Sequence, residues 1–541
     1  MEVLIFLVVL YILLAISRVK IYEKAGIPGW KALVPGLAAV EWCKLVGRKP
    51  WYAAWLLFPI VNIFIYAGLC IDTVRSFGKH SFWQAALAVI YAPIPFFLIG
   101  LNPRDKYNGP ILEQEREFQK QYAEAKAKGD KVALRRLETN NPFKKSPLRE
   151  WVEAIIFAVF AAAFIRMFLI EAFVIPTSSM EGSLKVGDYL FVSKAHYGIR
   201  MPMTVLQFPL IHNRFSQKSS GFLARESYLK KPSLPYFRLP ALEQIDRNEP
   251  VVFNFPAGDS VIITPGRTYD IYQWRREMEL LQRLNRPQPP MPPVVVRPID
   301  KKDHYIKRCI ALPGDSLQIR DGQVYINGQP AVNPRHLQFA YYIRNQEGGM
   351  LSLRKLEEIG VNLSDAIPVE LPTGELRRYY NLDAEQVAKV KSWGAGITVE
   401  RFEPGARPGY VFPNDAAQYG HWTVDNFGPI YIPKKGATVS LTPASLPFYE
   451  RIIRVYEGHK LEIRDGKYFI DGKETSTYTF QQNYYWMMGD NRHNSEDSRI
   501  WGYVPEDHVV GKPLFIFFST KNASLRNGIN WNRLFRSASQ M

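Results

Sequence analysis

The chain has 541 residues, a formal net charge of +17 at neutral pH and three cysteines. A balance this basic predicts an anionic partner, and because no nucleic-acid-binding motif accompanies it, the sequence favours membrane lipids over nucleic acid. Cys309 is the one cysteine outside the apolar first third of the chain, which excludes a disulfide within the remaining part and a cysteine-rich zinc site.

Four apolar stretches approach the roughly 20 residues that a membrane-spanning helix needs. They are Val3–Ile16, Trp51–Cys70, Phe82–Leu101 and Trp151–Ile170. The first is short enough for a signal peptide, but it lacks a positively charged start and a small-residue cleavage site, so we interpret it as an anchor. The sequence thus predicts an N-terminal membrane domain of three spans over residues 1–101 and a fourth span over 150–172.

Lysine and arginine gather in two of the loops between these stretches. The loop after the first stretch and the segment 102–149 are strongly basic, whereas the turn between the second and third stretches holds only Arg75 and Lys79. Because basic loops stay on the cytoplasmic side, we expect both there and everything after Ile170 outside. Within the second basic segment, the polar stretch Glu113–Glu138 predicts a solvated helix.

Beyond Ile175 the pattern becomes one of short strands. Runs rich in Val, Ile, Tyr and Phe alternate with polar residues and are separated by Gly, Asp and Asn, which predicts antiparallel hairpins in barrel-like or sandwich layers. We expect a mainly β domain formed by residues 173–332 and 446–541. An α+β lobe over 333–445, with a helix at Asp383–Trp393, is predicted to interrupt it.

Two of the predicted hairpins, at residues 314–328 and 458–472, are near copies of each other. Extending their alignment backwards places Arg451 opposite Lys307. Because a guanidinium does not lose its proton in proteins, only the first copy could supply a base. The alternative is that both are hairpins of one sheet that merely resemble each other.

Three short segments carry chemically reactive groups. Ile175–Met180 is rich in hydroxyls and follows the fourth apolar stretch, Asp303–Asp315 places a lysine in an apolar strand, and Met488–Gly502 is dense in polar residues. Each has a structural interpretation when taken alone, because a serine-rich turn after a helix is usually a cap and a single lysine is usually a surface charge.

Together the three segments resemble the signature motifs of bacterial type I signal peptidases, here with an additional N-terminal multi-span membrane region. The resemblance covers about residues 146–330 and 430–541. It implies a serine endopeptidase of the bacterial cytoplasmic membrane, multi-pass, with its signal-peptidase-like β domain on the periplasmic side. Its partners would be precursor proteins bearing signal peptides, which it would cleave through an acyl-enzyme intermediate without a cofactor or metal.

The resemblance implies that Ser179 is the nucleophile and Lys307 its general base, whose pKa burial would lower. Ser178 is the alternative nucleophile, but the family pattern selects the serine directly before Met180. Thr177 matches the position whose hydroxyl helps to form the oxyanion hole, together with the Ser179 N–H group.

The same resemblance assigns supporting roles to further residues. Ser495 would orient the lysine, Asp497 and Arg499 would form a structural ion pair, and Gly489 would allow close backbone approach. Shallow pockets for the small residues before the cleavage site would be lined by Phe173, Ile175, Tyr305 and Ile306. His493 departs from the family pattern, which often has aspartate there.

The same residues could also serve other classes of protein. A Ser-His-Asp triad could use His304, His493 or His508, but none of these stands in a triad motif. A catalytically silent membrane scaffold is disfavoured by the presence of both Ser179 and Lys307. A metal-dependent hydrolase is disfavoured because no His/Glu pair with helical spacing lies in a stretch predicted to be a helix.

Overall fold

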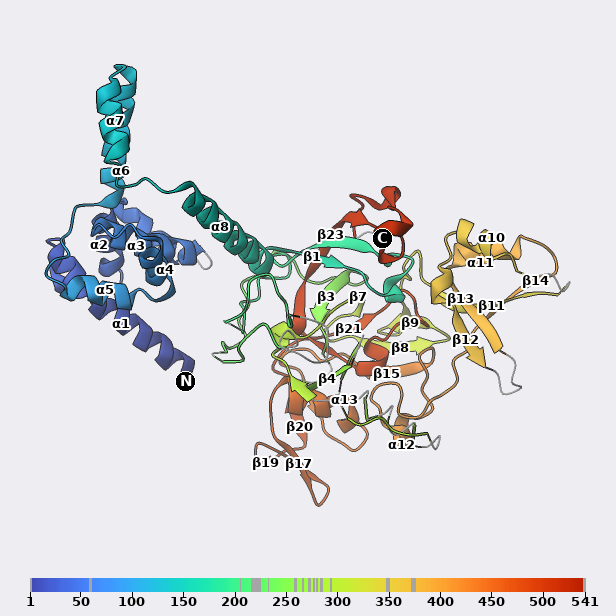
Figure 1. Cartoon of the computed structure of the whole chain (residues 1–541). Coiled ribbons are helices and arrows are strands. Elements are labelled where there is room, and N and C mark those ends of the chain that lie inside the picture. The colour runs from blue at the N-terminus through green and yellow to red at the C-terminus, as the bar shows by residue number, and fades with distance from the viewer. Residues whose placement is uncertain are drawn as a thin grey trace. The chain divides into compact units, whose positions relative to one another are not determined.

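The computed structural model divides into two compact units, Met1–Ala161 and Ala162–Met541 (Figure 1). It describes residues 2–57, 61–204, 206–215, 225–231, 233–256, 260–264, 267–270, 274–275, 278, 281–282, 286–291, 294–346, 351–370 and 376–538.

The first unit is helical. Its elements are α1 (Glu2–Lys24), η1 (Gly29–Ala32), α2 (Leu37–Val46), η2 (Pro50–Leu57), α3 (Val61–Ser76), α4 (Phe82–Tyr91), α5 (Pro93–Leu101), α6 (Ile111–Ala127) and α7 (Lys131–Thr139), followed by α8 (Pro147–Phe168), which continues into the second unit. Its core gathers around Trp42, whose ring meets that of Phe96 edge-on at 6.0 Å.

The predicted spans differ in how they fold. Among the residues described, α8 is the one helix that is by itself long and apolar enough to cross a membrane. The second predicted span is not a single helix, since Trp51–Leu57 forms the 3₁₀ helix η2 before α3 begins, and residues 58–60 lie outside the described part. The third bends by 118° between α4 and α5, at the residue before Pro93. A multi-span region therefore remains a prediction.

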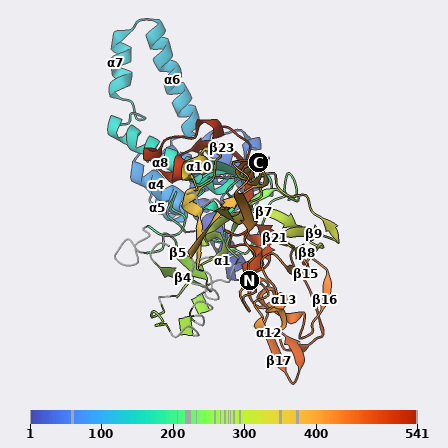
Figure 2. The same cartoon turned by 90° about the vertical axis from the view of Figure 1, so that its right-hand side faces the viewer.

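The polar stretch predicted as one helix forms two. Figure 2 shows α6 and α7 as a helical hairpin. The break falls at Gly129, which has a positive φ, and Asp130 caps the new helix by accepting from the Val132 and Ala133 amides.

The second unit is mainly β, as predicted, and every strand pairing described in its sheets is antiparallel. The central sheet has seven strands in the order β1 (Ile170–Val174), β2 (Asp188–Ser193), β23 (Val509–Ser519), β3 (Pro250–Asn254), β7 (His304–Ala311), β21 (Tyr484–Met488) and β22 (Val504–Pro505). A second sheet contains β10 (Gln329–Pro330), β9 (Gln323–Ile326), β8 (Ser316–Arg320) and β15 (Phe427–Tyr431).

Smaller elements complete this unit. The remaining strands are β4 (Ser260–Thr264), β5 (Arg267–Asp270), β6 (Val294–Val296), β16 (Thr438–Ser440), β17 (Leu461–Arg464), β18 (Lys467–Ile470), β19 (Lys473–Glu474) and β20 (Thr477–Thr479). In the described part of this unit, the helices outside the lobe's own sheet include α12 (Ala416–Tyr419), α13 (Leu446–Arg451) and α14 (Ser498–Trp501), and short turns of helix include η3 (Ser178–Met180), η5 (Ile299–Lys301), η7 (Ile452–Tyr456), η8 (Glu506–His508), η9 (Lys521–Ala523), η10 (Leu525–Asn527) and η11 (Trp531–Arg533).

The middle of the central sheet is covered on both faces. On β3, Val251 and Phe253 belong to one buried cluster and Val252 to another on the opposite face. Because β3 and β7 pair directly, a side chain from either face of β7 enters an apolar environment. This arrangement explains why a lysine in β7 is buried.

The inserted lobe has its own sheet and core. The sheet order is β12 (Ile367–Glu370), β13 (Leu376–Leu382), β11 (Phe339–Asn345) and β14 (Ile397–Arg401), and α10 (Leu353–Glu358), η6 (Leu363–Asp365) and α11 (Ala384–Lys391) belong to the same lobe (Figure 1). The predicted helix at Asp383–Trp393 is confirmed as α11, which Asp383 begins with a capping box. Within the predicted range 333–445, β15 pairs instead with β8 of the main body.

The repeated hairpins are confirmed, but the wider repeat is not. In β8–β9, Leu317 pairs with Ile326 across an Asp-Gly turn, and β17–β18 repeats this register with Leu461 and Ile470. The extension that set Arg451 opposite Lys307 is wrong, because Arg451 ends helix α13 whereas Lys307 lies in a strand.

Candidate active site

Ser179 and Lys307 lie 128 residues apart in the chain and meet in the structure. Ser179 occupies the short 3₁₀ turn η3, which the chain enters after the edge strand β1. Lys307 lies in β7, where it pairs with Val251 of β3. Its Nζ atom lies 2.5 Å from Ser179 Oγ, and Lys307 and Ser179 are only 3% and 9% exposed.

Burial sets the protonation of Lys307. Removing its ammonium group from water lowers the pKa to about 8, although the carboxylates of Asp497, Glu496 and Asp490 act in the opposite direction. The amine also lies 5.7 Å from the ring centroid of Tyr305. A lysine with this pKa is partly neutral near neutral pH and can take the proton of the hydroxyl that it contacts.

A second group near Ser179 titrates in the same range. Burial raises the pKa of Glu181 to about 7, and Lys185 opposes this shift while Asp365 adds to it. Any pH dependence of the site therefore has to be separated into a carboxyl contribution and a lysine contribution.

The loop that follows β21 packs against the serine. A Cβ atom at Gly489 would lie 2.5 Å from the carbonyl oxygen of Ser179 and still closer to Ser495 Oγ, so glycine is required there. Asp497 accepts hydrogen bonds from the Gly489 N–H group at 3.0 Å and from the Ser495 hydroxyl at 2.9 Å. Arg499 donates to the same carboxylate at 2.9 and 2.7 Å, and both charged side chains are buried.

These contacts fix a negative charge beside the lysine. Burial alone would raise the pKa of Asp497, but Arg499 and the hydrogen bonds from Gly489 and Ser495 hold it below the usual value. The described hydrogen bond of the Ser495 hydroxyl is made to this carboxylate, so its role in orienting Lys307 remains a prediction.

Two asparagines that the sequence analysis did not single out hold the turn η3. The Asn491 N–H group donates to the Ser179 carbonyl at 3.2 Å, and its side chain donates to the Ser178 carbonyl at 3.3 Å. Asn494 donates to the Ser178 hydroxyl at 3.1 Å. The two neighbouring hydroxyls thus have different partners, an amide for Ser178 and the amine of Lys307 for Ser179. The polar density of residues 488–502 was the one sequence signal for these contacts.

Arg308 was also missed. It donates to Asp490 at 2.8 and 2.6 Å, and Asp490 accepts a further hydrogen bond from Ser183 at 2.6 Å. This buried ion pair joins β7 to the start of the loop after β21 and to the segment just beyond Ser179. The sequence alone offered no indication of this ion pair, because nothing distinguishes Arg308 there except its place beside Lys307.

The residues predicted for the oxyanion hole and for the substrate walls lie in two different clusters and one exposed position. Thr177 is exposed, and its hydroxyl makes no hydrogen bond to any residue in the described part of the chain. Phe173, Ile175 and Ile306 share one apolar cluster. Tyr305 belongs to the cluster on the opposite face of the sheet, where its ring stacks on Phe255 at 4.7 Å. The structure therefore brings three of the four predicted wall residues together and places the fourth apart.

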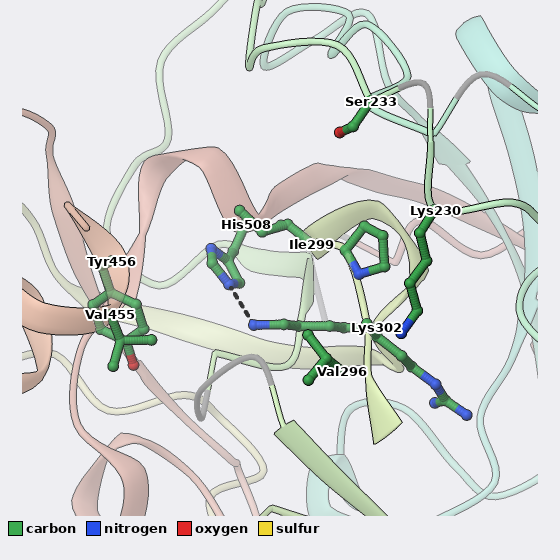
Figure 3. A pocket seen from close by; sticks show the side chains of 10 residues that line it. Lys230, Ser233, Val296, Ile299, Lys302, Val455, Tyr456 and His508 are labelled. Carbon is green, nitrogen blue, oxygen red and sulfur yellow. Dashed lines mark hydrogen bonds between the residues drawn. The ribbon is translucent and has the colours of Figure 1, made fainter. Parts of the chain in front are cut away.

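The histidines considered for a triad have other partners. His304 packs against His212 and Phe173, with ring centroids 4.1 and 4.8 Å away. His493 contacts Asp425 at 3.0 Å. His508 lines a separate pocket of about 340 Å³, where its Nδ1 contacts Asp507 at 2.6 Å and its Nε2 lies 3.4 Å from the Lys302 amine (Figure 3). The described contacts therefore give no support to a Ser-His-Asp triad.

Comparison with known proteins agrees with the geometry of this site. The model of the family described as signal peptidase, peptidase S26, matches residues 148–359 and 454–518, and that of a family of unknown function matches residues 30–110. Similar proteins named signal peptidase I include one from Helicobacter pylori strain J99, 22% identical over 398 residues that cover 72% of this chain and 90% of that protein. Another, from Bacillus licheniformis, is 26% identical over 278 residues, which cover 51% of this chain and 95% of its own.

A third, from Rickettsia massiliae, is 22% identical over 386 residues, covering 71% of this chain and 84% of that protein. The two segments matched by the family model contain Ser179, Lys307 and the loop from Gly489 to Arg499. The chain therefore belongs to the signal peptidase family, peptidase S26.

Proposed function

We propose that this peptidase removes N-terminal signal peptides from exported precursor proteins, with Ser179 as its nucleophile and Lys307 as its general base. The observation that supports this most directly is the 2.5 Å contact between Lys307 Nζ and Ser179 Oγ, made by a lysine whose pKa burial lowers to about 8. A hydroxyl attacks a peptide carbonyl poorly unless a neighbouring base removes its proton.

The chemistry follows from this contact. Neutral Lys307 takes the proton from Ser179 Oγ as the oxygen attacks the carbonyl carbon, and the resulting ammonium gives that proton to the departing amine. The carbonyl oxygen becomes an oxyanion, for which the Thr177 hydroxyl and the Ser179 N–H group are the proposed donors. Water then attacks the ester on Ser179, again after losing a proton to Lys307.

The remaining residues support the pair. Asp497, held by Arg499 and bonded to Ser495, stabilises the lysine when it carries the proton. Gly489 lets the loop approach the Ser179 carbonyl. Phe173, Ile175 and Ile306 offer an apolar wall for the small residues before the cleavage site, and Tyr305 lies beside the lysine.

The proposed setting is the outer surface of the bacterial cytoplasmic membrane. Helix α8 ends at Phe168, and β1 leads from there to η3, which we call the nucleophile turn. A spanning α8 would therefore hold Ser179 near the membrane surface. We further propose that residues 1–101 add three spans, that 102–149 is cytoplasmic, and that membrane lipids rather than nucleic acid account for the basic charge.

The experiment that tests this function is cleavage of a model precursor by the purified full-length chain in detergent. We expect one cut, after a small residue at the end of the signal peptide. Replacing that residue by phenylalanine should slow cleavage by about 100-fold, because a pocket for a methyl group cannot admit a ring. The same replacement several residues further into the mature chain is the control and should have little effect. Cleavage that ignores both replacements, or that occurs at many sites, would contradict the proposal.

A further inference from the structure

The inserted lobe touches both segments that form the active site. We propose that the lobe, here residues 336–346, 351–370 and 376–402, acts as a positioning element for the catalytic loop, Gly489–Arg499. His493 is the side chain of that loop that fastens it to the lobe. This inference rests on the proposed function and assigns a role to a lobe that the dyad chemistry does not itself require.

Backbone pairing provides the first attachment. Gln338, just before β11, donates from its N–H group to the Asp490 carbonyl and accepts from the Arg492 N–H group, both at 2.9 Å. It thereby forms a parallel bridge with Asn491, whose own N–H group holds the Ser179 carbonyl. One residue of the catalytic loop thus contacts the lobe on one side and the nucleophile turn on the other.

His493 provides the second attachment, and its tautomer follows from its partners. The backbone N–H group of Ala340 lies 3.1 Å from Nδ1 and can only donate, so Nδ1 accepts. The proton of the neutral ring is then on Nε2, which donates to Asp425 Oδ2 at 3.0 Å. Burial lowers the pKa of His493, which keeps the ring in this neutral form. The rings of Phe339 and Phe402 meet it edge-on at 5.3 and 5.7 Å.

Asp425, which accepts the hydrogen bond from His493, also accepts one from the lobe. Arg401, at the end of β14, donates to the same Asp425 oxygen at 2.7 Å, and its guanidinium lies 3.9 Å from the Phe339 ring centroid. On the catalytic side, Arg499 donates to the carbonyl of Arg492 at 2.7 Å while it holds Asp497. His493 therefore lies between the lobe and the residues that set the charge around Lys307.

A separate contact reaches the nucleophile turn. Burial raises the pKa of Asp365 in the lobe, and the side chain of Ser178, the residue before the nucleophile, acts against this shift, which places the two side chains close together. The backbone at Gly182 adopts φ +100°, and a Cβ atom there would collide with the carbonyl oxygen of His336. Because the lobe contacts both Ser178–Gly182 and the loop after β21, it is placed to fix the distance between the nucleophile and the groups around its base.

The test compares two substitutions of equal size. His493→Gln keeps a donor toward Asp425, whereas His493→Glu places a second buried carboxyl against it, so that the two groups either repel each other or must take up a proton. We expect His493→Glu to lower kcat for the model precursor by about 100-fold with little change in KM, because a loop misplaced by about 1 Å impairs the dyad rather than substrate binding. His493→Gln should stay within about 10-fold of the wild type.

Exchanging the donor and the acceptor of the hydrogen bond between positions 493 and 425 should restore part of the kcat lost in His493→Glu. In the double variant His493→Glu with Asp425→Asn, the amide donates to the new carboxylate and the pair again carries one negative charge, so kcat should recover by at least about 10-fold over His493→Glu alone. Glu358→Gln, on an exposed part of α10, is the control for a change in the lobe away from the contact and should be neutral.

The outcomes separate this inference from the proposed function. If Ser179→Ala abolishes cleavage while folded His493→Glu cleaves at the wild-type rate, only the positioning role of the lobe is overturned. The same conclusion follows if the double variant has the wild-type Tm but no recovered kcat. If Ser179→Ala retains cleavage, the proposed function itself fails.

Discussion

Replacing Lys307 by alanine should lower kcat for precursor cleavage by on the order of 10⁴-fold, and replacing it by arginine should do the same. Alanine removes the base. Arginine keeps the positive charge and can still donate to Ser179 Oγ, but a guanidinium does not lose its proton near neutral pH and cannot receive that of the serine. The arginine variant therefore tests proton transfer rather than charge.

The measurement is single-turnover cleavage of the model precursor, with Tm recorded for each variant to establish that it folds. Lys521→Arg, in an exposed turn, is the matched control and should leave the rate unchanged. Substantial cleavage by a folded Lys307→Arg protein would show that the base lies elsewhere.

Ser179→Ala should be as inactive as Lys307→Ala, and the two substitutions together should be no worse than either alone, because a nucleophile and its base act as one unit. Ser178→Ala should lose no more than about 10-fold. Its hydroxyl is engaged by Asn494 rather than by the lysine, so alanine there loosens the turn without removing a reacting atom.

This comparison also decides between the neighbouring serines that the sequence presented. Precursor binding by Ser179→Ala, measured by co-purification, is expected to persist because the apolar wall around Phe173 and Ile306 is unchanged. An active Ser179→Ala protein beside an inactive Ser178→Ala protein would reverse the assignment.

Local patterns were sufficient to predict the elements whose causes are local. The Asp-Gly turns of both repeated hairpins carry positive φ values at Asp321 and Asp465, which their short side chains tolerate, and the hairpins form where predicted. Helix α11 likewise starts at the capping residue Asp383. The mainly β character of the second unit follows from many such signals together.

Features that depend on distant contacts were not predictable in this way. The approach of Ser179 to Lys307 depends on the order of strands in the central sheet, and only the resemblance to a family suggested it. The similarity of the hairpins β8–β9 and β17–β18 does not continue back to Lys307 and Arg451, because a helix precedes the second hairpin where a strand precedes the first. The attachment of the lobe through His493 depends on partners 68 and 153 residues away in the chain.

One prediction that the structure corrects, a shared wall formed by Tyr305 and Ile306, could have been corrected from the sequence alone. Neighbouring residues of a strand face opposite sides of the sheet, so Tyr305 and Ile306 could not line the same wall, and the structure places them in different clusters. Pro93 and Pro95, with one residue between them, likewise indicate a break in the third apolar stretch, which bends by 118°.

The pH dependence of kcat/KM tests the central claim, that Lys307 is the base, most directly. Because the reacting form is the neutral amine and its pKa is lowered to about 8, kcat/KM should rise about tenfold per pH unit below about pH 8 and level off above it. Glu181→Gln removes the other group that titrates nearby and should leave this midpoint in place. A midpoint near 6.5, as for a histidine, or a profile whose basic limb disappears in Glu181→Gln, would contradict the assignment of Lys307.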